Sequence, residues 1–169
     1  LINNIDETDS TIITARVIGR DPTQWSKMVF IDKGTDHQVK ENLVVMTDAG
    51  IIGHVIHVSA KASKVLLITD SRSAVDSLFQ ETRETGVTVG TGQDVCKMKF
   101  VPIGADVKIG DRIVSSGLGG VFPKGLVVGT VVDIVKKKQD LFQSITVAPS
   151  ADLSQIEEVV VILSKKEES

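Results

Sequence analysis

The chain has 169 residues, of which 41% are hydrophobic, 24% are charged and only 4% are aromatic, and its formal net charge is -3 at pH 7. A chain of this length buries a sizeable core as one large domain or two small ones, and with so few aromatic residues Val, Ile and Leu must fill that core. The negative net charge argues against a nucleic acid partner, and the absence of a run of about eighteen apolar residues argues against a membrane span within the chain.

The first ten residues carry a short helical pattern. Leu1 and Ile5 recur at the i, i+4 spacing of a helix among polar residues. A segment this short does not persist as an isolated helix. The chain also begins without an initiator Met or a signal peptide, so we expect a fragment of a longer protein, with residues 1–10 as the end of a longer helix.

From Thr11 onward the pattern changes to short apolar runs bounded by Gly, Pro, Asp or clusters of charge, which predicts strands joined by hairpins. Alternation within the run 126–136 puts Val128 and Val132 on one apolar face and Val127 and Val131 on the other, as in a strand covered on both sides. The predicted strands are Thr11–Gly19, Lys27–Asp32, Leu43–Thr47, Ile51–Ser59, Lys64–Thr69, Gly86–Gly90, Lys97–Pro102, Arg112–Ser115, Leu126–Lys136, Ser144–Pro149 and Glu158–Leu163.

Two stretches also carry helix signals. Residues 73–86 offer an N-cap, an acid three residues later, apolar residues at helical spacing and a final Gly, so local propensity alone predicts a helix there. A second short helix is predicted at Asp152–Glu157.

The order of the strands predicts an all-β architecture of two small six-stranded β-barrels. Five strands precede Asp70, about six fall between residues 74 and 149, and one remains near the end. If the last strand returns to the first group, the first barrel is discontinuous and comprises residues 11–72 plus 150–163, and the second comprises residues 73–149. Residues 164–169 are then a disordered tail. Barrels this small are filled by their own side chains.

The sequence offers little that indicates catalysis. A double six-stranded barrel has the arrangement of chymotrypsin-like peptidases, and His37, Asp70 and Ser115 or Ser116 occur in the order of a catalytic triad. The Asp-Gly pair expected around a peptidase serine is absent, so we expect a Gly-rich turn there and no triad. A serine peptidase of double-barrel fold remains one alternative.

No metal or cofactor site is expected either. His54 and His57 are three residues apart on a predicted strand and therefore point to opposite faces. The Gly-rich pair Gly90 and Gly92 opens no helix, so it is not a dinucleotide fingerprint. Cys96 is the single cysteine, and we expect it to be a small buried hydrophobe.

Five stretches together resemble the MreC family of rod shape-determining proteins, in order and spacing from about Thr11 to Leu163. The most specific is SGLGGVFPKG within the fourth. The stretches are Ala15–Trp25 (ARVIGRDPTQW), Gly50–Val55 (GIIGHV), Leu67–Asp70 (LITD), Gly110–Gly125 (GDRIVSSGLGGVFPKG) and Val147–Leu153 (VAPSADL).

The resemblance implies a non-catalytic scaffold of the cell-wall elongation machinery, which maintains rod shape. It implies a single-pass protein of the bacterial cell membrane with this domain on the extracytoplasmic side, anchored by a segment outside this chain. The implied partners are the elongation penicillin-binding protein, a transpeptidase, and other rod-shape membrane proteins, with a link to the cytoskeletal filament. A homodimer through the N-terminal coiled coil is also implied, for which 1–10 is the end of the coiled-coil helix. A β-barrel adaptor domain of an envelope export system is the second alternative.

The candidate contacts to a partner or between the barrels are Phe122, Trp25, Leu118, Leu1 and Ile5. We expect Phe122 to pack as a core plug between the barrels and Trp25 to cap a barrel.

The chain departs from the family pattern in two places. Where the family has Gly before Val39, this chain reads Thr35-Asp36-His37-Gln38, and we expect Asp36 to take the left-handed position. Between Asp70 and Gly86 the family pattern is extended, and we favour a strand there over the helix that propensity predicts, because tertiary context often overrides propensity.

Overall fold

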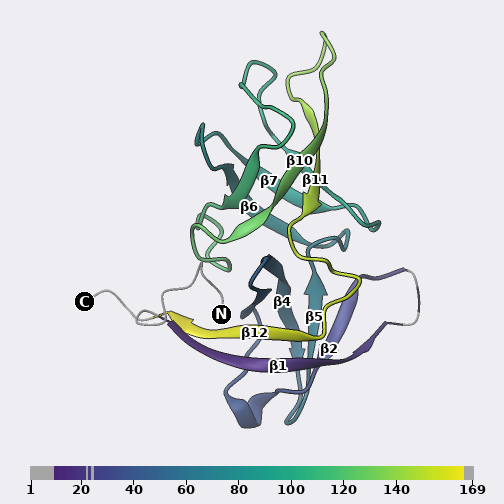
Figure 1. Cartoon of the computed structure of the whole chain (residues 1–169), viewed down its shortest axis with the longest axis vertical. Helices are drawn as coiled ribbons and strands as arrows, with labels where there is room; N and C mark the ends of the chain where they lie inside the picture. The colour runs from purple at the N-terminus through teal and green to yellow at the C-terminus, as the bar shows by residue number, and fades with distance from the viewer. Residues whose placement is uncertain (1–9, 22, 24, 166–169) are drawn as a thin grey trace.

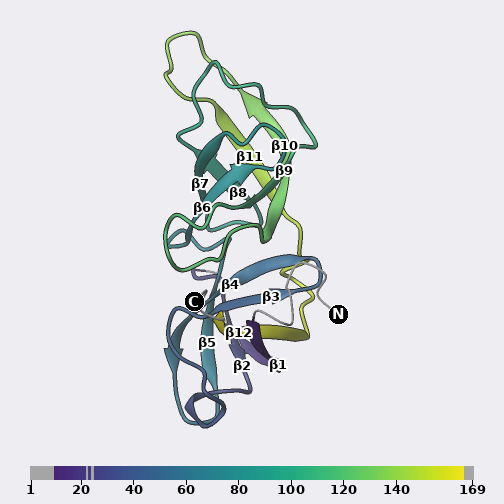
Figure 2. The same ribbon diagram turned by 90° about the vertical axis from the view of Figure 1, so that its left-hand side faces the viewer.

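A computed structural model describes residues 10–21, 23 and 25–165 of the chain. Its regular structure in these ranges consists of β-strands and one short 3-10 turn, η1 (Thr35–His37), without an α-helix. All strand pairs are antiparallel and close into two six-stranded barrels, which confirms the predicted fold class. The barrels are stacked along the long axis of the molecule (Figures 1 and 2).

The first barrel is completed by the last strand of the chain. Its strands follow the order β1-β12-β3-β4-β5-β2, and β12 lies beside β1 although about 140 residues separate them (Figure 1). The pairing of β12 with β3 closes the sheet on its other side. The strands are β1 (Ser10–Arg20), β2 (Met28–Ile31), β3 (Val44–Thr47), β4 (Gly50–Val58), β5 (Ser63–Leu67) and β12 (Glu158–Lys165).

The second barrel is formed by one continuous stretch of chain. Its strands follow the order β10-β11-β8-β7-β6-β9. The hairpin between β10 and β11 ends at the pole of this barrel farthest from the first one (Figure 1). The strands are β6 (Ala74–Phe79), β7 (Thr85–Gly90), β8 (Cys96–Lys99), β9 (Arg112–Ser115), β10 (Val127–Val135) and β11 (Ser144–Pro149).

Two apolar clusters fill the molecule, and they are not equivalent. One lies inside the first barrel. The other fills the second barrel and continues across the junction into residues of the first. Burial of this continuous apolar surface favours a fixed arrangement of the two barrels. The first-barrel members of the shared cluster are Val44, Met46, Ile51, Ile68 and Ile162.

The extended backbone expected for residues 73–86 is confirmed, and the helix that propensity alone predicted there is wrong. Val75, Ser77 and Phe79 alternate inward on β6 and are at most 1% exposed. β6 lies between β7 and β9, so both of its edges are hydrogen-bonded. As a strand of the barrel, this segment pairs its backbone with both neighbours and buries its apolar side chains. An isolated helix would leave those side chains exposed, so tertiary context overrides the helix propensity.

The helix predicted at Asp152–Glu157 is also wrong, because these residues form turns. The Asp152 carboxylate accepts hydrogen bonds from the Ser154 N–H and hydroxyl at 3.1 and 2.7 Å. Side chains of this type often close a local turn in place of starting a helix. Here the turn returns the chain from the second barrel to the first, and Ile156 is buried in the first-barrel core.

The predicted ends of the chain need two smaller corrections. Ser10 begins β1, so it is not the last residue of a helix, and β12 continues to Lys165 into the segment predicted as a tail. The predicted coiled-coil residues 1–9 and the tail residues 166–169 lie outside the described residues.

A β-bulge changes the predicted faces of β10. The register shifts between Val131 and Asp133, so Val128 and Val131 are both buried, whereas Val132, predicted to share a face with Val128, is 47% exposed. An extra residue in one strand reverses the alternation beyond it. A left-handed residue was likewise misplaced: Gln38 has φ 67° and takes the position that we assigned to Asp36.

Candidate functional site

The loop between β9 and β10 is the most distinctive feature of the junction between the barrels. Gly117, Gly120 and Gly125 have φ between 80° and 90° there, in the left-handed region that favours glycine. The loop carries Phe122, which is buried with 7% of its surface exposed. The Phe122 ring meets the His54 ring of β4 edge to face, with centroids 5.9 Å apart. Phe122 therefore packs between the barrels.

The His54 imidazole is adapted to this apolar contact. Burial lowers the pKa of His54 below its usual range, because a charged ring loses its hydration there. Within the described part of the chain its Nδ1 atom has no hydrogen-bond partner. We therefore expect a neutral ring that serves as a packing surface for Phe122.

A carboxylate fastens the connection between the barrels. Asp70 lies directly before the second barrel and is 2% exposed. Its oxygens accept hydrogen bonds from the Lys27 N–H at 2.8 Å and from Arg72 Nε and Nη2 at 2.9 and 3.1 Å. Burial raises the pKa of Asp70, but the hydrogen bonds from Arg72 and Lys27 outweigh it and hold this pKa below its usual value. The carboxylate is thus ionised and fully engaged at neutral pH.

Close backbone approaches seal the same junction. A Cβ atom on Gly90 of β7 would lie 1.9 Å from the Asp70 carbonyl oxygen, and one on Gly50 of β4 would lie 2.6 Å from the Val127 carbonyl oxygen. The Cys96 thiol donates to the Ile68 carbonyl at 3.3 Å, and burial raises the pKa of Cys96 to about 12. As expected, Cys96 is a buried hydrophobe, and its thiol is not poised to react.

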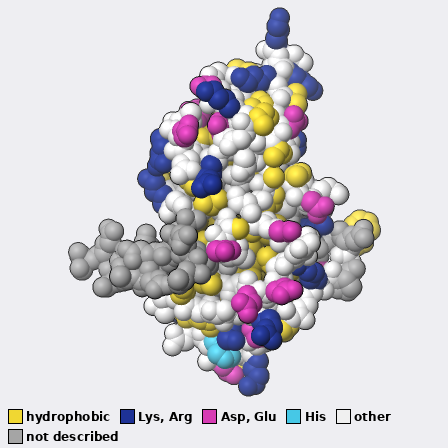
Figure 3. Space-filling view, in the orientation of Figure 1, with side chains coloured by type: hydrophobic (Ala, Val, Ile, Leu, Met, Phe, Trp, Pro, Cys, Tyr) yellow, Lys and Arg dark blue, Asp and Glu magenta, His cyan; other side chains and the backbone are white. Residues whose placement is uncertain are grey.

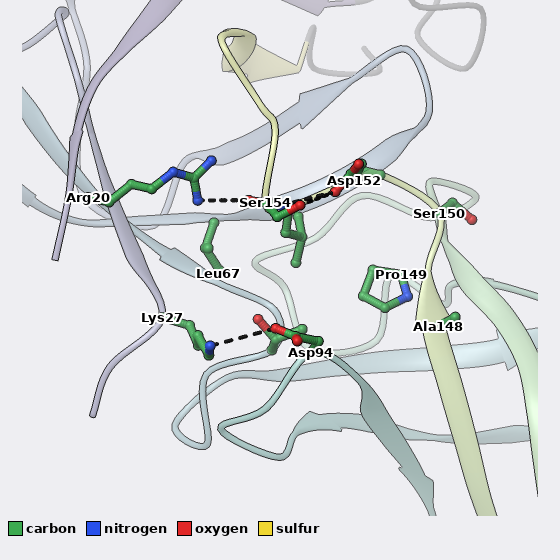
Figure 4. Close-up of a pocket in the computed structure, with 12 residues that line it drawn as sticks. Arg20, Lys27, Leu67, Asp94, Ala148, Pro149, Ser150, Asp152 and Ser154 are labelled. Carbon is green, nitrogen blue, oxygen red and sulfur yellow. Dashed lines mark hydrogen bonds and ion pairs between the residues drawn. The ribbon is translucent and has the colours of Figure 1, made fainter. Parts of the chain in front are cut away.

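Two hollows flank the sealed junction. The first, of about 520 Å³, has Arg20, Lys27 and Leu67 of the first barrel on one side and Asp94 and Pro149 of the second on the other (Figure 4). On the first-barrel side Arg20 Nη1 donates to the Leu153 carbonyl at 2.8 Å, and a 3.7 Å ion pair between Lys27 and Asp94 crosses the hollow. Because the Asp94 side chain is 99% exposed, this ion pair contributes little stability.

The second hollow, of about 500 Å³, is lined by the β9–β10 loop together with Leu43, Ile162 and Leu163 of the first barrel. Leu118 stands at this hollow with 77% of its surface exposed, in contrast to the buried Phe122 four residues later. Exposed apolar side chains that line a groove together mark candidate protein-binding sites, and Leu43, Val121 and Leu163 line this groove with Leu118. Leu118 and this groove are therefore our candidate binding surface.

The remaining predicted contacts are not brought to the junction. Trp25 is 92% exposed, so the expectation that it caps a barrel is wrong: it lies in the turn before β2, outside the barrel wall. Leu1 and Ile5 fall outside the described residues. The pattern that found Phe122 and Leu118 was the glycine spacing of their loop.

No catalytic triad is assembled from the predicted residues. Asp70 is bonded to Lys27 and Arg72, as described above. The Ser115 hydroxyl donates to the Pro123 carbonyl and accepts from the Leu126 N–H at 2.9 Å. His37 belongs to η1 at the exposed surface of the first barrel. Among the described residues none of the three is hydrogen-bonded to another.

Sequence reasoning missed the two partners that make the junction rigid. Arg72 and His54 were not assigned any role there, although the spacing Asp70-x-Arg72 permits a local bidentate pair. His54 gave no such signal, since its neighbour Phe122 is 68 residues away in the chain.

Comparison with known proteins identifies close likenesses in sequence. A family model described as the barrel core of the rod shape-determining protein MreC matches residues 17–163. The cell shape-determining protein MreC of Listeria monocytogenes is 34% identical over 96% of this chain and 58% of its own length. That of Escherichia coli is 30% identical over 91% of this chain and 42% of its own. The chain thus spans about half the length of these curated relatives.

Solved structures give the same result for the fold. The crystal structure of MreC from Pseudomonas aeruginosa superposes with a TM-score of 0.88 at 29% identity, covering 90% of this chain and 99% of that one. MreC in a complex with the penicillin-binding protein PBP2 from Helicobacter pylori superposes with a TM-score of 0.66 over 90% of this chain and 99% of that one, and at 17% identity it shows the fold alone.

These comparisons also bear on the enzyme question. The matched family consists of structural, shape-determining proteins and not of known enzymes. This agrees with the prediction that the chain is not an enzyme, and it disfavours the peptidase and export-adaptor alternatives. Within the described residues the structure contains no helix long and apolar enough to cross a membrane.

Proposed function

The chain belongs to the MreC family, and from that premise we propose that its two barrels form a non-catalytic scaffold of the cell-wall elongation machinery. The scaffold maintains rod cell shape by binding wall-synthesis enzymes outside the membrane and linking them to the cytoskeletal filament. Support for the cell-shape role comes from relatives described as cell shape-determining proteins.

One observation carries the non-catalytic part of this proposal. The potentially reactive side chains at the junction are all engaged in structural hydrogen bonds. Asp70 accepts from Arg72 and Lys27. Ser115 is bonded to Pro123 and Leu126, and Cys96 donates to Ile68. The shared apolar cluster keeps the barrels together. A rigid body that leaves Leu118 exposed beside a groove is suited to hold a partner.

The proposed partner is the elongation penicillin-binding protein, a transpeptidase, together with other rod-shape membrane proteins. The Helicobacter pylori complex of PBP2 with MreC supports a partner of this type. We also propose that the domain lies on the extracytoplasmic side of the bacterial cell membrane, on a protein anchored by a segment outside this chain. Leu1 and Ile5, at helical spacing, support dimerisation through an N-terminal coiled coil.

A binding isotherm tests the proposal directly. The titrant is the purified extracytoplasmic domain of the elongation transpeptidase from the same organism. Saturable binding is expected, and Leu118→Ser should weaken it at least about tenfold, since a central apolar anchor often carries more than 1.4 kcal/mol of binding energy.

The matched control is Ile18→Ser on β1, which removes a side chain that is 58% exposed and lies outside the groove. The melting temperature of both variants should stay unchanged. Absence of binding, for this chain and for the full-length extracytoplasmic part of the protein, would contradict the proposed function. If Leu118→Ser leaves the affinity unchanged, the partner binds another surface, and the scaffold function still holds.

A further inference from the structure

An exposed aromatic pair lies on the second barrel, beyond the junction. Phe100 follows β8 and Phe142 precedes β11, and their rings meet edge to face with centroids 5.8 Å apart. Their surfaces are 58% and 45% exposed, and Leu141 beside them is 78% exposed. Apolar side chains reach the surface of this barrel between lysine and arginine side chains (Figure 3). We call Phe100, Phe142 and the groove beside them the aromatic groove.

Backbone geometry places Phe100 outside the barrel. Met98 points into the core and is 1% exposed, and regular alternation would send Phe100 inward too. Phe100 instead has φ 68°, in the left-handed region, which ends the strand and leaves its ring in solvent, while Val101 enters the core at 0% exposure. A bulky residue adopts this conformation rarely, and such outliers gather at functional sites.

The groove itself is apolar and concave. It has a volume of about 420 Å³ and extends along the paired strands β8 and β11 from Phe100 and Phe142 toward Lys97. β8 and β11 are each paired on both edges, so an occupant does not add a strand to the sheet. An extended segment that lies across them directs its alternate side chains into the groove.

Charge selects the occupant. Lys97 and Lys99 line the groove, whereas its lining contains no Asp or Glu. Lys97 donates to Thr146 Oγ1 at 2.8 Å, and among the described residues neither lysine belongs to an ion pair within 4.0 Å. Asp140 is the nearest acid in sequence, at the hairpin tip outside the lining. The groove is therefore complementary to a segment in which acidic residues lie next to apolar ones.

We propose that the aromatic groove binds an extended segment of a protein partner in which apolar side chains alternate with Asp or Glu. A lipid surface is the competing occupant for exposed phenylalanines beside lysines. The hollow of about 420 Å³ beside the rings favours the peptide, because it accepts a side chain, whereas a bilayer interface meets protruding tips.

Fluorescence anisotropy with a short labelled peptide, in which leucine and phenylalanine alternate with glutamate, tests the proposal. The chain should bind it saturably, and more weakly at about 500 mM than at about 50 mM salt. Binding should be at least about tenfold tighter than that of the same peptide with lysine in place of glutamate.

Phe100→Ala and Lys99→Glu should each weaken the glutamate peptide about tenfold or more. Ile109→Ala, which removes an apolar side chain that is 61% exposed and outside the groove lining, should not. Unchanged melting temperatures establish that the variants are folded.

Three results would overturn the proposal: no binding of the glutamate peptide, equal binding of the lysine peptide, or binding that Phe100→Ala leaves intact. A parallel sedimentation with vesicles of phosphatidylglycerol and phosphatidylethanolamine addresses the competing occupant. Vesicle binding that Phe100→Ala abolishes would assign the groove to lipid and reject the peptide.

Discussion

Phe122 and Phe100 belong to the same barrel and have opposite environments. Phe122 lies on a glycine-rich loop, yet it is buried because the first barrel covers it with His54. Phe100 directly follows a strand, yet it is exposed because its left-handed backbone turns it away from the core. The contrast shows that the burial of these two rings depends on backbone conformation and on which surface the other barrel covers, and not on residue type.

The strongest test of this contrast removes each ring in turn. Phe122→Ala should lower the free energy of unfolding by about 3–5 kcal/mol, because it leaves a cavity between the barrels. Phe100→Ala, at the exposed surface, should change it by no more than about 0.5 kcal/mol. Urea denaturation of both variants checks this, and equal losses would show that the two environments are not different.

The close approach of backbone at the junction predicts the next largest effect. Gly90→Ala places a Cβ atom 1.9 Å from the Asp70 carbonyl oxygen, so the chain must shift, at a cost of about 2–3 kcal/mol. Gly104→Ala, in the outer loop before β9, meets no atom within 4 Å and should be neutral or slightly stabilising. Thermal unfolding of the pair measures the difference. A harmless Gly90→Ala would mean that the junction is looser than described.

Asp70 adds a pH dependence to the stability of the junction. Asp70→Asn should cost about 1–2 kcal/mol at pH 7, because it removes a charged acceptor for Arg72 and Lys27. The pKa of Asp70 is held below 3.8, the ordinary value for an aspartate. The stabilisation by its carboxylate is therefore fully present above that value and is lost as the pH falls through the lower folded-state pKa.

We expect the difference in free energy of unfolding between Asp70→Asn and the unaltered chain to be constant from about pH 7 downward and to decrease only near pH 3. Asp106→Asn, at an exposed position of the outer loop, is the control and should change the free energy of unfolding at pH 7 by no more than about 0.5 kcal/mol. If the loss of stability in Asp70→Asn is constant across this whole range, the ionised carboxylate is not the source of that stability.

The smallest effect is expected at Trp25, which lies exposed in the turn before β2 and does not cap a barrel. Since its side chain is 92% exposed, Trp25→Ala should leave the free energy of unfolding within about 0.5 kcal/mol of the original value. Its fluorescence should already have the emission of a solvated indole in the folded state. A blue-shifted emission, or a large loss of stability, would restore the expected capping role.

Much of the fold could be predicted because each strand carries its own signal. Runs such as Arg112–Ser115 and Ser144–Pro149 are bounded by turn residues, and the structure begins and ends these strands at the same residues. Errors arose where one local pattern fits two structures. Residues 73–86 satisfy the rules for a helix, and only pairing with β7 and β9 selects the strand. An aspartate begins a helix in many proteins, but Asp152 closes a turn here.

The candidate site was less predictable. Glycine spacing pointed to the loop of Phe122 and Leu118, but no local signal separates the buried ring from the exposed leucine. The bulge that exposes Val132 and the left-handed conformation of Phe100 are each absent from any alternation pattern. Both depend on how neighbouring strands must align.

By itself, the sequence determined the all-β class, the two groups of strands and the family. These follow from periodicity, turn chemistry and motif order, which are local along the chain. Only the tertiary structure decided that β12 closes the first barrel, that His54 meets Phe122, that Arg72 and Lys27 hold Asp70, and that Phe100 remains exposed. Each of these depends on contacts between residues distant in sequence or, for Phe100, on a left-handed backbone conformation. Neither leaves a periodic signal in a single chain.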